Sequence, residues 1–310
     1  MKKKLLFIVN PRAGLGRIHQ SLFGIVDIFI RNGYEVILHT TQASMDACNT
    51  VQEYAANVDM VVCSGGDGTL DEVATGVFHA GVNIPVGYIP AGSTNDFANS
   101  LFLPKDPLVI AQNIMKGNIY RCDIGQLNDK VFIYVAAFGL FTNVSYETPQ
   151  DMKNILGHMA YVLEGAKRLF DFKSYHMRAE ANGISIERDF IYGMVTNSRS
   201  IGGFKNLTKN VDMDDGLFEV TLIEMPTNPV ELQQIVTALL LAEDNIEMIH
   251  SFKTRHLLLE SDTPIPWTLD GEFGGEHTRV EIINHQNALP LLLTSEKHRQ
   301  EENIPPVQSS

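Results

Sequence analysis

The sequence predicts a protein of two domains, an N-terminal α/β domain built on a mostly parallel sheet and a C-terminal domain of antiparallel β-strands. A chain of 310 residues suits two domains of ordinary size. Over the first 125 or so residues, short apolar runs alternate with amphipathic stretches, which is typical of βαβ units. After Asp123 the pattern changes to strand-like segments separated by short turns, which favours a sandwich or a barrel.

The α/β domain is predicted from strands and helices that alternate along the chain. The run LLFIV at Leu5–Val9 is continuously apolar, as expected of a parallel strand that is buried on both faces. We therefore expect a doubly wound, mostly parallel sheet. The elements that follow are a helix at 19–33, a strand at 34–40, a helix at 44–57, a strand at 60–66, a helix at 71–81, a strand at 84–92 and a helix at 107–118.

The second domain is predicted from strand-like segments with one helical stretch among them. ANGIS at 181–185 has the composition of a hairpin turn, and the stretch at 155–170 has helical spacing of apolar residues. The predicted strands lie at 130–139, within 170–198, and at 216–225, 255–261 and 279–285. The expected boundaries are 1–125 for the α/β domain, 126–285 for the β-sandwich domain and 299–310 for a flexible tail, and 286–298 is a candidate to return to the α/β domain.

Composition excludes several classes of protein. The formal net charge of −13 argues against nucleic acid as a partner. Hydrophobic residues make up 44% and charged residues 20%, as in ordinary globular proteins, and no apolar run is long enough to cross a bilayer. The three cysteines are scattered singly, and the apolar stretch of MKKKLLFIVN is too short for a signal peptide, so we expect a cytoplasmic protein.

Three glycine-containing turns follow predicted strands of the first domain. They are NPRAG at 10–14, SGGDGT at 64–69 and PAGSTND at 90–96. Ligands of open parallel sheets bind beyond the carboxyl ends of the strands, so these turns can converge on one site. Bare main-chain N–H groups and the start of a helix suit a phosphate. The hydroxyl and amide side chains that could assist are those of Asn10, Thr41, Thr69, Ser93, Thr94 and Asn95.

Two common nucleotide signatures do not account for these turns. No GxxxxGK[ST] motif is present, so the chain is not a P-loop enzyme. The early loop has Gly14 and Gly16, but His19 stands where the dinucleotide-binding motif needs a third glycine. The support for a Rossmann dinucleotide site is therefore weak.

The run SGGDGTLDEVATG, with NPRAG before it and PAGSTNDFA after it, resembles the diacylglycerol kinase catalytic domain. The chain is most similar to the soluble bacterial diacylglycerol kinases and related lipid kinases, which also resemble NAD kinases and phosphofructokinases. NVDMDDG at 210–216 and LDGE at 269–272 extend the resemblance over nearly the whole chain. GGDGT alone would be shared with NAD kinases, whereas the ordered set of five motifs is far more specific.

The resemblance implies that ATP and a lipid meet in a cleft between an α/β nucleotide domain and a β-sandwich domain. It also implies that Asp67, Asp96 and Asp123 lie near the Mg²⁺–ATP site, since hard carboxylate oxygens suit that metal. The simpler interpretation makes Asp96 a helix cap and Asp123 part of a turn. The ATP site carried over by position comprises Asn10, Pro11, Arg12, Ala13, Gly14, Thr41, Gly66, Asp67, Gly68, Thr69, Leu70, Asp71, Glu72, Ser93 and Thr94.

Two further sets of residues are implied in the second domain. In the family, the element matching TLDGE supplies the base that takes the proton from the lipid hydroxyl, and here both Asp270 and Glu272 are candidates. NVDMDDG resembles a second, structural magnesium site, with Asn210, the carbonyl of Met213 and Asp215 as ligands. Each motif can also be read as a plain β-turn.

The implied activity is transfer of a phosphoryl group from ATP to a lipid alcohol, with diacylglycerol as the first candidate. Some relatives carry a lysine where Leu15 stands, and a further lysine is expected near Tyr161, where Glu164 falls in the register. These differences leave the acceptor lipid open. A sphingoid base, a monoacylglycerol or a glycerophospholipid is the alternative substrate, NAD kinase is a further alternative, and a catalytically silent nucleotide or lipid sensor is the alternative of a different class. We expect transient peripheral contact with a membrane and take a homodimer as the default assembly.

Overall fold

The computed structural model describes residues 2–93, 95–140, 173–197, 212–241 and 246–293. Thr94, Asn210 and the predicted helix at 155–170 lie outside the described residues. The chain divides into two compact units, Met1–Arg121 with Leu289–Ser310, and Cys122–Ala288. Each unit has its own hydrophobic core.

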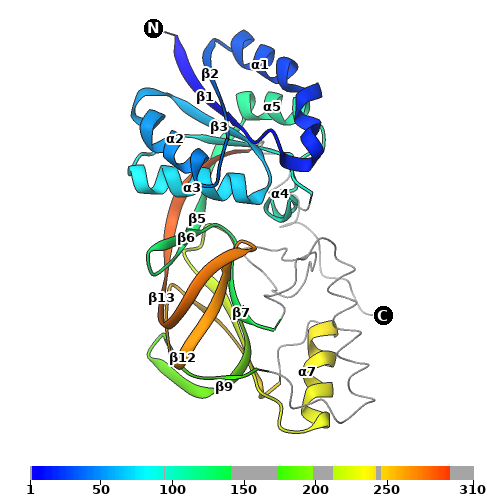
Figure 1. Ribbon diagram of the computed structural model, residues 1–310, viewed down its shortest axis with the longest axis vertical. Coiled ribbons are helices and arrows are strands. Elements are labelled where there is room, and N and C mark those ends of the chain that lie inside the picture. Colours follow the sequence, from blue (N-terminus) through cyan, green and yellow to red (C-terminus); the bar gives the residue numbers. More distant parts are fainter. Residues whose placement is uncertain (1, 94, 141–172, 198–211, 242–245, 294–310) are drawn as a thin grey trace, which may run out of the picture. The chain divides into compact units, whose positions relative to one another are not determined.

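The first unit is built on a parallel sheet with the strand order β4-β3-β1-β2 (Figure 1). Its strands pair parallel, and Leu291 at the end of β13 pairs with Val86 of β4. β1 is buried from Leu5 to Val9, as its apolar run predicts. The strands are β1 (Lys3–Val9), β2 (Tyr34–Thr40), β3 (Met60–Gly65) and β4 (Val86–Pro90).

Helices cover both faces of this sheet. α1 packs against α5 on one face, and α2 packs against α3 on the other (Figure 1). On the first face, the ring of Phe29 meets that of Phe7 edge-on at 5.5 Å. The helices are η1 (Ala13–Gln20), α1 (Leu22–Arg31), α2 (Asp46–Tyr54), η2 (Ala55–Asn57), α3 (Asp67–Ala80), α4 (Asp96–Ser100) and α5 (Pro107–Lys116).

The second unit consists mainly of antiparallel strands. Its sheet runs in the order β11-β10-β9-β7-β12-β13, and β8 pairs with both β9 and β12. Because β9 and β12 are long, each pairs with β7 along one part and with β8 along another. The strands are β5 (Asn118–Leu127), β6 (Lys130–Phe132), β7 (Val135–Gly139), β8 (Tyr175–Ala181), β9 (Ile184–Thr196), β10 (Phe218–Glu224), β11 (Ile249–Thr254), β12 (His256–Leu269) and β13 (Glu272–Leu293).

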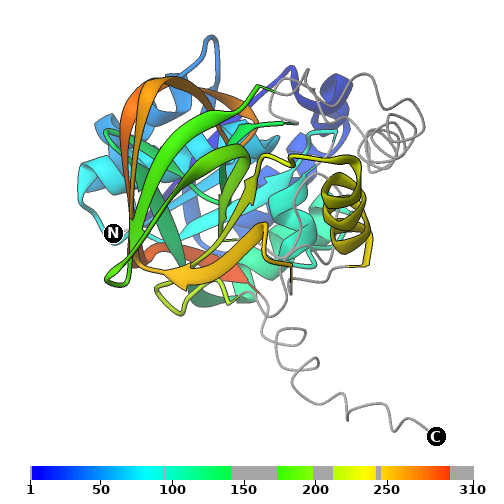
Figure 2. The same cartoon turned by 90° about the horizontal axis from the view of Figure 1, so that it is seen from below.

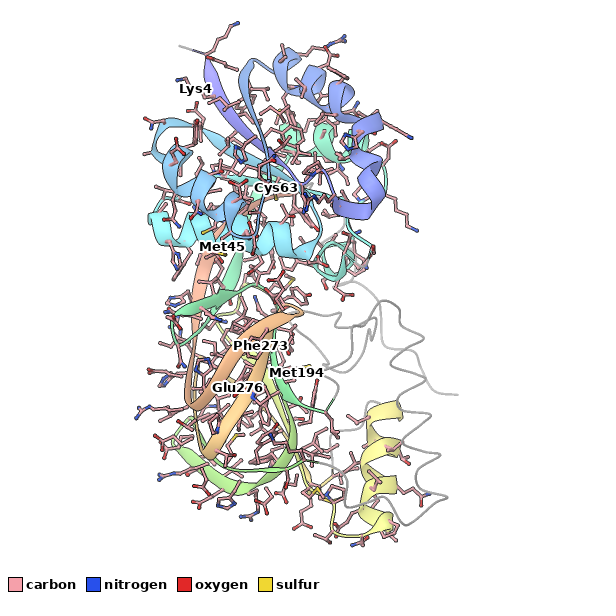
Figure 3. All side chains as sticks on the ribbon, viewed as in Figure 1. Lys4, Met45, Cys63, Met194, Phe273 and Glu276 are labelled. Carbon is pink, nitrogen blue, oxygen red and sulfur yellow. The ribbon has the colours of Figure 1, made fainter. Side chains whose placement is uncertain are left out.

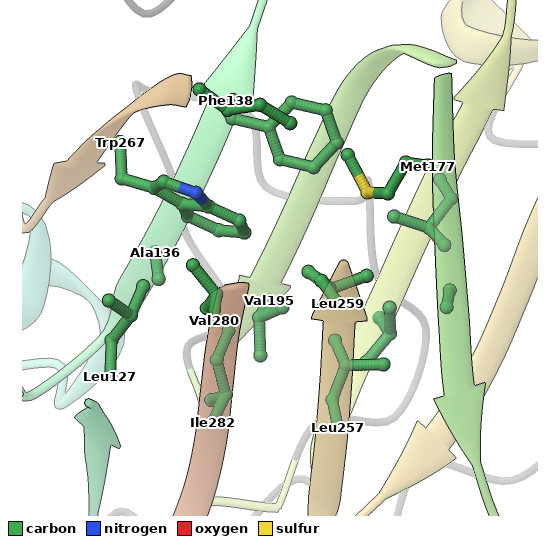
Figure 4. Packing of buried hydrophobic residues seen from close by; sticks show 14 of the residues in the cluster. Leu127, Ala136, Phe138, Met177, Val195, Leu257, Leu259, Trp267, Val280 and Ile282 are labelled. Carbon is green, nitrogen blue, oxygen red and sulfur yellow. The ribbon is translucent and has the colours of Figure 1, made fainter. Parts of the chain in front are cut away.

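Aromatic and branched side chains fill the core of the second unit. Trp267 packs against Phe138, with ring centroids 4.9 Å apart, among Leu257, Leu259 and Val280 (Figure 4). Only 1% of Trp267 is exposed, so this residue belongs to the core.

The helix α7 (Pro229–Leu241) was not predicted from the sequence. The start of this helix is specified locally, because Asn228 Oδ1 accepts hydrogen bonds from the N–H groups of Val230 and Glu231, at 3.0 Å each. Glu231 in turn accepts from the N–H of Thr227, the residue before the cap, at 2.6 Å, an arrangement close to a capping box. Figure 2 shows α7 beside the strands of this unit, where it packs against buried isoleucines of β9, β10 and β11.

Two-residue turns join β8 to β9 and β12 to β13. Both central residues of each turn have positive φ, 52° and 77° at Asn182–Gly183 and 49° and 88° at Asp270–Gly271. Asn-Gly and Asp-Gly are the pairs that favour this hairpin geometry. The predicted hairpin at 181–185 is therefore confirmed, and the second hairpin fixes the position of Glu272.

Candidate functional site

The three glycine-containing turns of the first unit meet at one edge of its sheet. β1, β3 and β4 are parallel neighbours, so their carboxyl ends share that edge. The N–H of Asn10 donates to the carbonyl of Ser64 at 2.8 Å, and the N–H of Ala91 donates to that of Gly65 at 2.7 Å. Asn10 Nδ2 also donates to Thr69 Oγ1 at 3.2 Å. The convergence predicted from the sequence is therefore present.

Glycine is required where these turns touch. Gly14 has a φ of 53°, and a Cβ atom there would lie 2.0 Å from the carbonyl oxygen of Ala91. A Cβ atom on Gly92 would lie 2.7 Å from the Cα of Gly66. These glycines let the turns pack against one another, in addition to any space that they leave for a ligand.

Asp67 is the first residue of α3 and joins it to α4. Its Oδ2 accepts the N–H of Asp96 at 2.9 Å, and its Oδ1 accepts the N–H of Phe97 at 3.4 Å. Burial raises the pKa of Asp67 to about 6; the N–H of Asp96 acts against this shift, and the carboxylate of Asp96 adds to it. The structure thus places two acidic residues together at the edge where the three turns meet, in an environment that disfavours the negative charge of Asp67.

Replacing Asp67 with asparagine is expected to stabilise the ligand-free protein at pH 8. The folded-state pKa lies above 3.8, so this carboxyl contributes most favourably below about pH 4, and that contribution is lost as pH rises through 6. Removing the charge should raise the free energy of unfolding by about 1–3 kcal/mol at pH 8. The amide oxygen of asparagine can still accept the N–H of Asp96.

The measurement is urea unfolding of both proteins at pH 5 and pH 8 with a chelator present. The difference in the free energy of unfolding between the two proteins should be larger at pH 8 than at pH 5. An asparagine variant that is no more stable than the wild type at pH 8 would contradict the account.

The other residues of the predicted nucleotide site differ in their surroundings. Glu72 accepts the N–H groups of Met45 and Ala47 at 2.8 and 3.0 Å, so its carboxylate caps the start of α2. Leu70 is fully buried in the core and offers only its main chain to a ligand. Arg12 and Ser93 are exposed, and Thr69 is held by Asn10. The remaining members, all half-buried, are Pro11, Ala13, Gly14, Thr41, Gly66, Gly68 and Asp71.

Asp270 of the second unit is a buried structural carboxylate. Its Oδ2 accepts the N–H of Ile133 at 2.6 Å, and its Oδ1 accepts those of Tyr134 and Val135 at 3.0 and 2.8 Å. Only 7% of the residue is exposed. These three main-chain donors tie the carboxylate of Asp270 to the segment at 133–135.

Glu272 lies in a different environment, two residues further along. It is exposed, and no described residue donates a hydrogen bond to its carboxylate. The turn between the two residues is fixed by the three hydrogen bonds to Asp270 and by the bond from the N–H of Asp270 to the carbonyl of Val135, at 2.9 Å. One carboxylate therefore holds the hairpin in place, and the other is exposed.

Asp123 lies in the second unit within a polar cluster. Its carboxylate accepts the N–H groups of Gly216 and Asn287 at 2.7 and 2.8 Å and Nδ2 of Asn284 at 3.3 Å. Burial raises its pKa, and these donors act in the opposite direction. The side-chain oxygens of Asn197 and Asn284 are buried without a hydrogen-bond partner. Unpartnered hard oxygens beside a carboxylate fit a magnesium ion.

Two of the ligands predicted for the second magnesium ion, the carbonyl of Met213 and Asp215, already have donors from the protein. The carbonyl of Met213 accepts the N–H of Asp123 at 2.8 Å. Asp215 accepts the N–H of Leu217 at 2.9 Å and Nζ of Lys253 at 3.1 Å. Lys253 also pairs with Glu219 at 2.9 Å, so an ion at Asp215 would compete with a lysine.

Sequence reasoning did not identify Asn197, Asn284 and Lys253 as parts of this cluster. Asn284 lies 161 residues from Asp123, and asparagine is too common at strand ends to stand out. The one local signal was polar residues within otherwise apolar strand segments, VTNS and IINH, where an amide needs a buried partner.

Two family models match the chain. The diacylglycerol kinase catalytic domain matches residues 4–127, and the YegS C-terminal NAD kinase beta sandwich-like domain matches residues 136–292. The first covers the three turns and Asp67, and the second covers the hairpin with Asp270 and Glu272. These matches define a two-domain protein of the lipid kinase class.

Relatives from several bacteria cover most of the chain. The diacylglycerol kinase of Bacillus subtilis is 30% identical over 301 residues, which are 96% of this chain and 99% of that protein. The diacylglycerol kinase of Staphylococcus saprophyticus is 31% identical over 278 residues, 89% of this chain and 91% of its own length. The chain therefore belongs to the diacylglycerol kinase family.

Solved structures agree with the fold. A Bacillus anthracis structure superposes with a TM-score of 0.78 at 25% identity, over 94% of this chain and 98% of its own. A second structure, described as a diacylglycerol kinase from the same organism, superposes with a TM-score of 0.72 at 22% identity, over 95% of this chain and 98% of its own. This likeness supports the fold alone. Among the described residues, no helix combines the length and hydrophobicity needed to cross a bilayer.

Proposed function

We propose that this protein is an ATP-dependent lipid kinase that phosphorylates the hydroxyl of diacylglycerol and yields phosphatidate. The observation that carries the proposal is the match to relatives named diacylglycerol kinase over almost the entire chain. Two features of the structure support it. The first unit has a glycine-rich sheet edge with paired acidic residues, and the second has an exposed carboxylate on an anchored hairpin.

The first unit is proposed to bind ATP. It would be a doubly wound domain like those of NAD kinases and phosphofructokinases, with boundaries near 1–125 and a returning C-terminal segment. Main-chain N–H groups of the three turns would hold the phosphates, with Arg12 as an exposed cation nearby. Magnesium bound with ATP would neutralise phosphate charge, and Asp67 and Asp96 are the carboxylates of this unit suited to hold it.

Glu272 is proposed to be the general base. Its carboxylate takes the proton of the lipid hydroxyl as the hydroxyl oxygen bonds to the γ-phosphorus of ATP. The bond from that phosphorus to the β–γ bridging oxygen breaks at the same time, and ADP leaves with the electron pair. Asp270 holds the hairpin that carries Glu272. This assigns the two carboxylates of the DGE motif to separate roles.

A second magnesium ion is proposed to bind at Asn210, Met213 and Asp215. Its neighbours would be Asp123 and the amide oxygens of Asn197 and Asn284. Magnesium alone should then raise the melting temperature of the wild-type protein. The same titration of Asp215→Asn should give a smaller shift. Equal shifts in the two proteins would contradict the proposed ligand.

The activity can be tested with labelled ATP, Mg²⁺ and mixed micelles of several lipid alcohols. Diacylglycerol should be labelled fastest, and Asp67→Ala should abolish the labelling. Preferred labelling of a sphingoid base, a monoacylglycerol or a glycerophospholipid would reassign the acceptor. ATP binding without transfer to any lipid would indicate a sensor and overturn the proposal.

Because diacylglycerol resides in membranes, the protein would contact a membrane peripherally and transiently. A homodimer stays a prediction.

A further inference from the structure

An exposed phenylalanine adjoins the proposed base in the chain. Phe273 follows Glu272 on the β12–β13 hairpin and is 68% exposed (Figure 3). The other large aromatic side chains in the core of this unit are buried, apart from Phe252, which is partly buried. Phe273 is thus an apolar side chain presented to the surroundings beside a group that must reach a lipid.

The hairpin presents Phe273 without competition from neighbouring side chains. Gly271 precedes Glu272, and Gly274 and Gly275 follow Phe273, so the tip carries only two side chains beyond Asp270. Phe273 pairs with Thr268 across the hairpin, and Glu272 pairs with buried Leu269. Since side chains alternate along a strand, the ring and the carboxylate leave the tip on opposite faces, with Cα atoms about 4 Å apart.

The tip is rigid. The three main-chain hydrogen bonds to Asp270 hold the turn to the segment at Ile133–Val135, and β12 pairs with β7 just before it. A rigid apolar group next to a reactive one fixes how deep that reactive group can enter a lipid surface. The hydroxyl of diacylglycerol lies at the boundary between the apolar chains and water, so depth decides whether a base can reach it.

We propose that Phe273 inserts into the membrane that contains diacylglycerol and positions Glu272 at the lipid hydroxyl. This rests on the proposed function and extends it by a positioning residue for the lipid substrate. Phe273 acts through Glu272 and does not itself take part in the phosphoryl transfer. An aromatic ring gains free energy on leaving water for the apolar part of a lipid surface.

Charge favours an apolar anchor over an electrostatic one. The formal net charge is −13, and the exposed carboxylates of Glu272 and Glu276 on the hairpin are part of it. Such a surface is repelled by anionic lipids and gains nothing from them. The contribution of Phe273 to membrane binding should therefore be measurable on uncharged phosphatidylcholine vesicles, and it should not decrease as salt is added.

The test compares Phe273→Ala with the wild type on two forms of the substrate. One is long-chain diacylglycerol in phosphatidylcholine vesicles, and the other is a short-chain diacylglycerol dissolved as monomers. On vesicles, binding by sedimentation and kcat/KM should both fall by about 10- to 100-fold, which corresponds to burial of one phenylalanine. The loss on the monomeric substrate should be at least about ten times smaller, because no surface has to be entered.

Matched controls separate this role from general loss of apolar surface. Ile184 and Val230 are 64% and 63% exposed in the same unit, and Ile184→Ala and Val230→Ala should bind vesicles as the wild type does. Phe273→Trp should restore both binding and activity. The apparent KM for ATP should be the same in all of these proteins.

Several results would overturn the proposal. Equal losses for Phe273→Ala on vesicles and on monomers would make Phe273 a structural residue or a direct contact. If Phe273→Ala binds vesicles as tightly as the wild type does, Phe273 is not a membrane anchor. A dimer that this variant dissociates would show that the ring covers a second copy of the chain. If the wild type binds vesicles through Phe273 but labels neither substrate, the proposed kinase function fails while the membrane anchor stands.

Discussion

Replacing Glu272 with glutamine is expected to lower kcat for diacylglycerol by about 100- to 10,000-fold, the range found when a general base is removed. Glutamine keeps the size and polarity of the side chain but cannot take up the hydroxyl proton. Because Glu272 is exposed and no described residue donates to it, the fold should not depend on its charge. The free energy of unfolding should change by less than about 0.5 kcal/mol. Steady-state kinetics and urea unfolding of the same preparation measure both quantities.

The control for this variant is Glu276→Gln. Glu276 is also exposed, lies on the same strand four residues further on, and carries the same charge. It should retain wild-type kcat, since only a carboxylate at the hairpin tip is proposed to meet the hydroxyl. Comparable losses in the two variants would show that the acidity of the hairpin matters and the position of Glu272 does not.

Replacing Asp270 with alanine is expected to lower the free energy of unfolding by about 3–5 kcal/mol. Its carboxylate accepts from three main-chain N–H groups, those of Ile133, Tyr134 and Val135, which are all buried. Each buried donor left without an acceptor costs about 1–3 kcal/mol, although water entering the gap recovers part of this. Urea unfolding at pH 7 measures the loss.

Asp270→Asn is the matched comparison. One oxygen remains as an acceptor while the other becomes an N–H₂ group that faces a donor, so this variant should lie between the wild type and alanine in stability. If Asp270→Ala unfolds like the wild type and loses only activity, Asp270 is a reactive group and our assignment of the two carboxylates is wrong.

The arrangement of the first unit could be predicted because its signals are local. Apolar runs such as Leu5–Val9 are buried strands, and the glycine turns after them meet because parallel neighbours end at the same edge. The pairing of Asp67 with Asp96 follows from that convergence. The sequence could not show that Glu72 caps α2 and that Gly14 fits against Ala91, because both contacts depend on atomic positions across the fold.

The roles of Asp270 and Glu272 could not be separated from the sequence, since DGE in a turn is compatible with either as the base. Their difference comes from a segment about 135 residues earlier, whose N–H groups reach one carboxylate and not the other. The same holds for Asp123, whose partners Gly216, Asn284 and Asn287 lie far along the chain. By contrast, α7 was missed although its capping sequence, T-N-P-V-E, was readable at 227–231.

The most direct test of the account follows the first turnover of the enzyme with labelled ATP already bound. In the wild-type protein, addition of diacylglycerol should transfer the label to phosphatidate in a rapid single step. In Glu272→Gln the nucleotide should bind with wild-type affinity and then remain as ATP, because the fold and the phosphate-binding turns are intact while the hydroxyl keeps its proton. Transfer at the wild-type rate in this variant would contradict the role of the hairpin carboxylate on which the account depends.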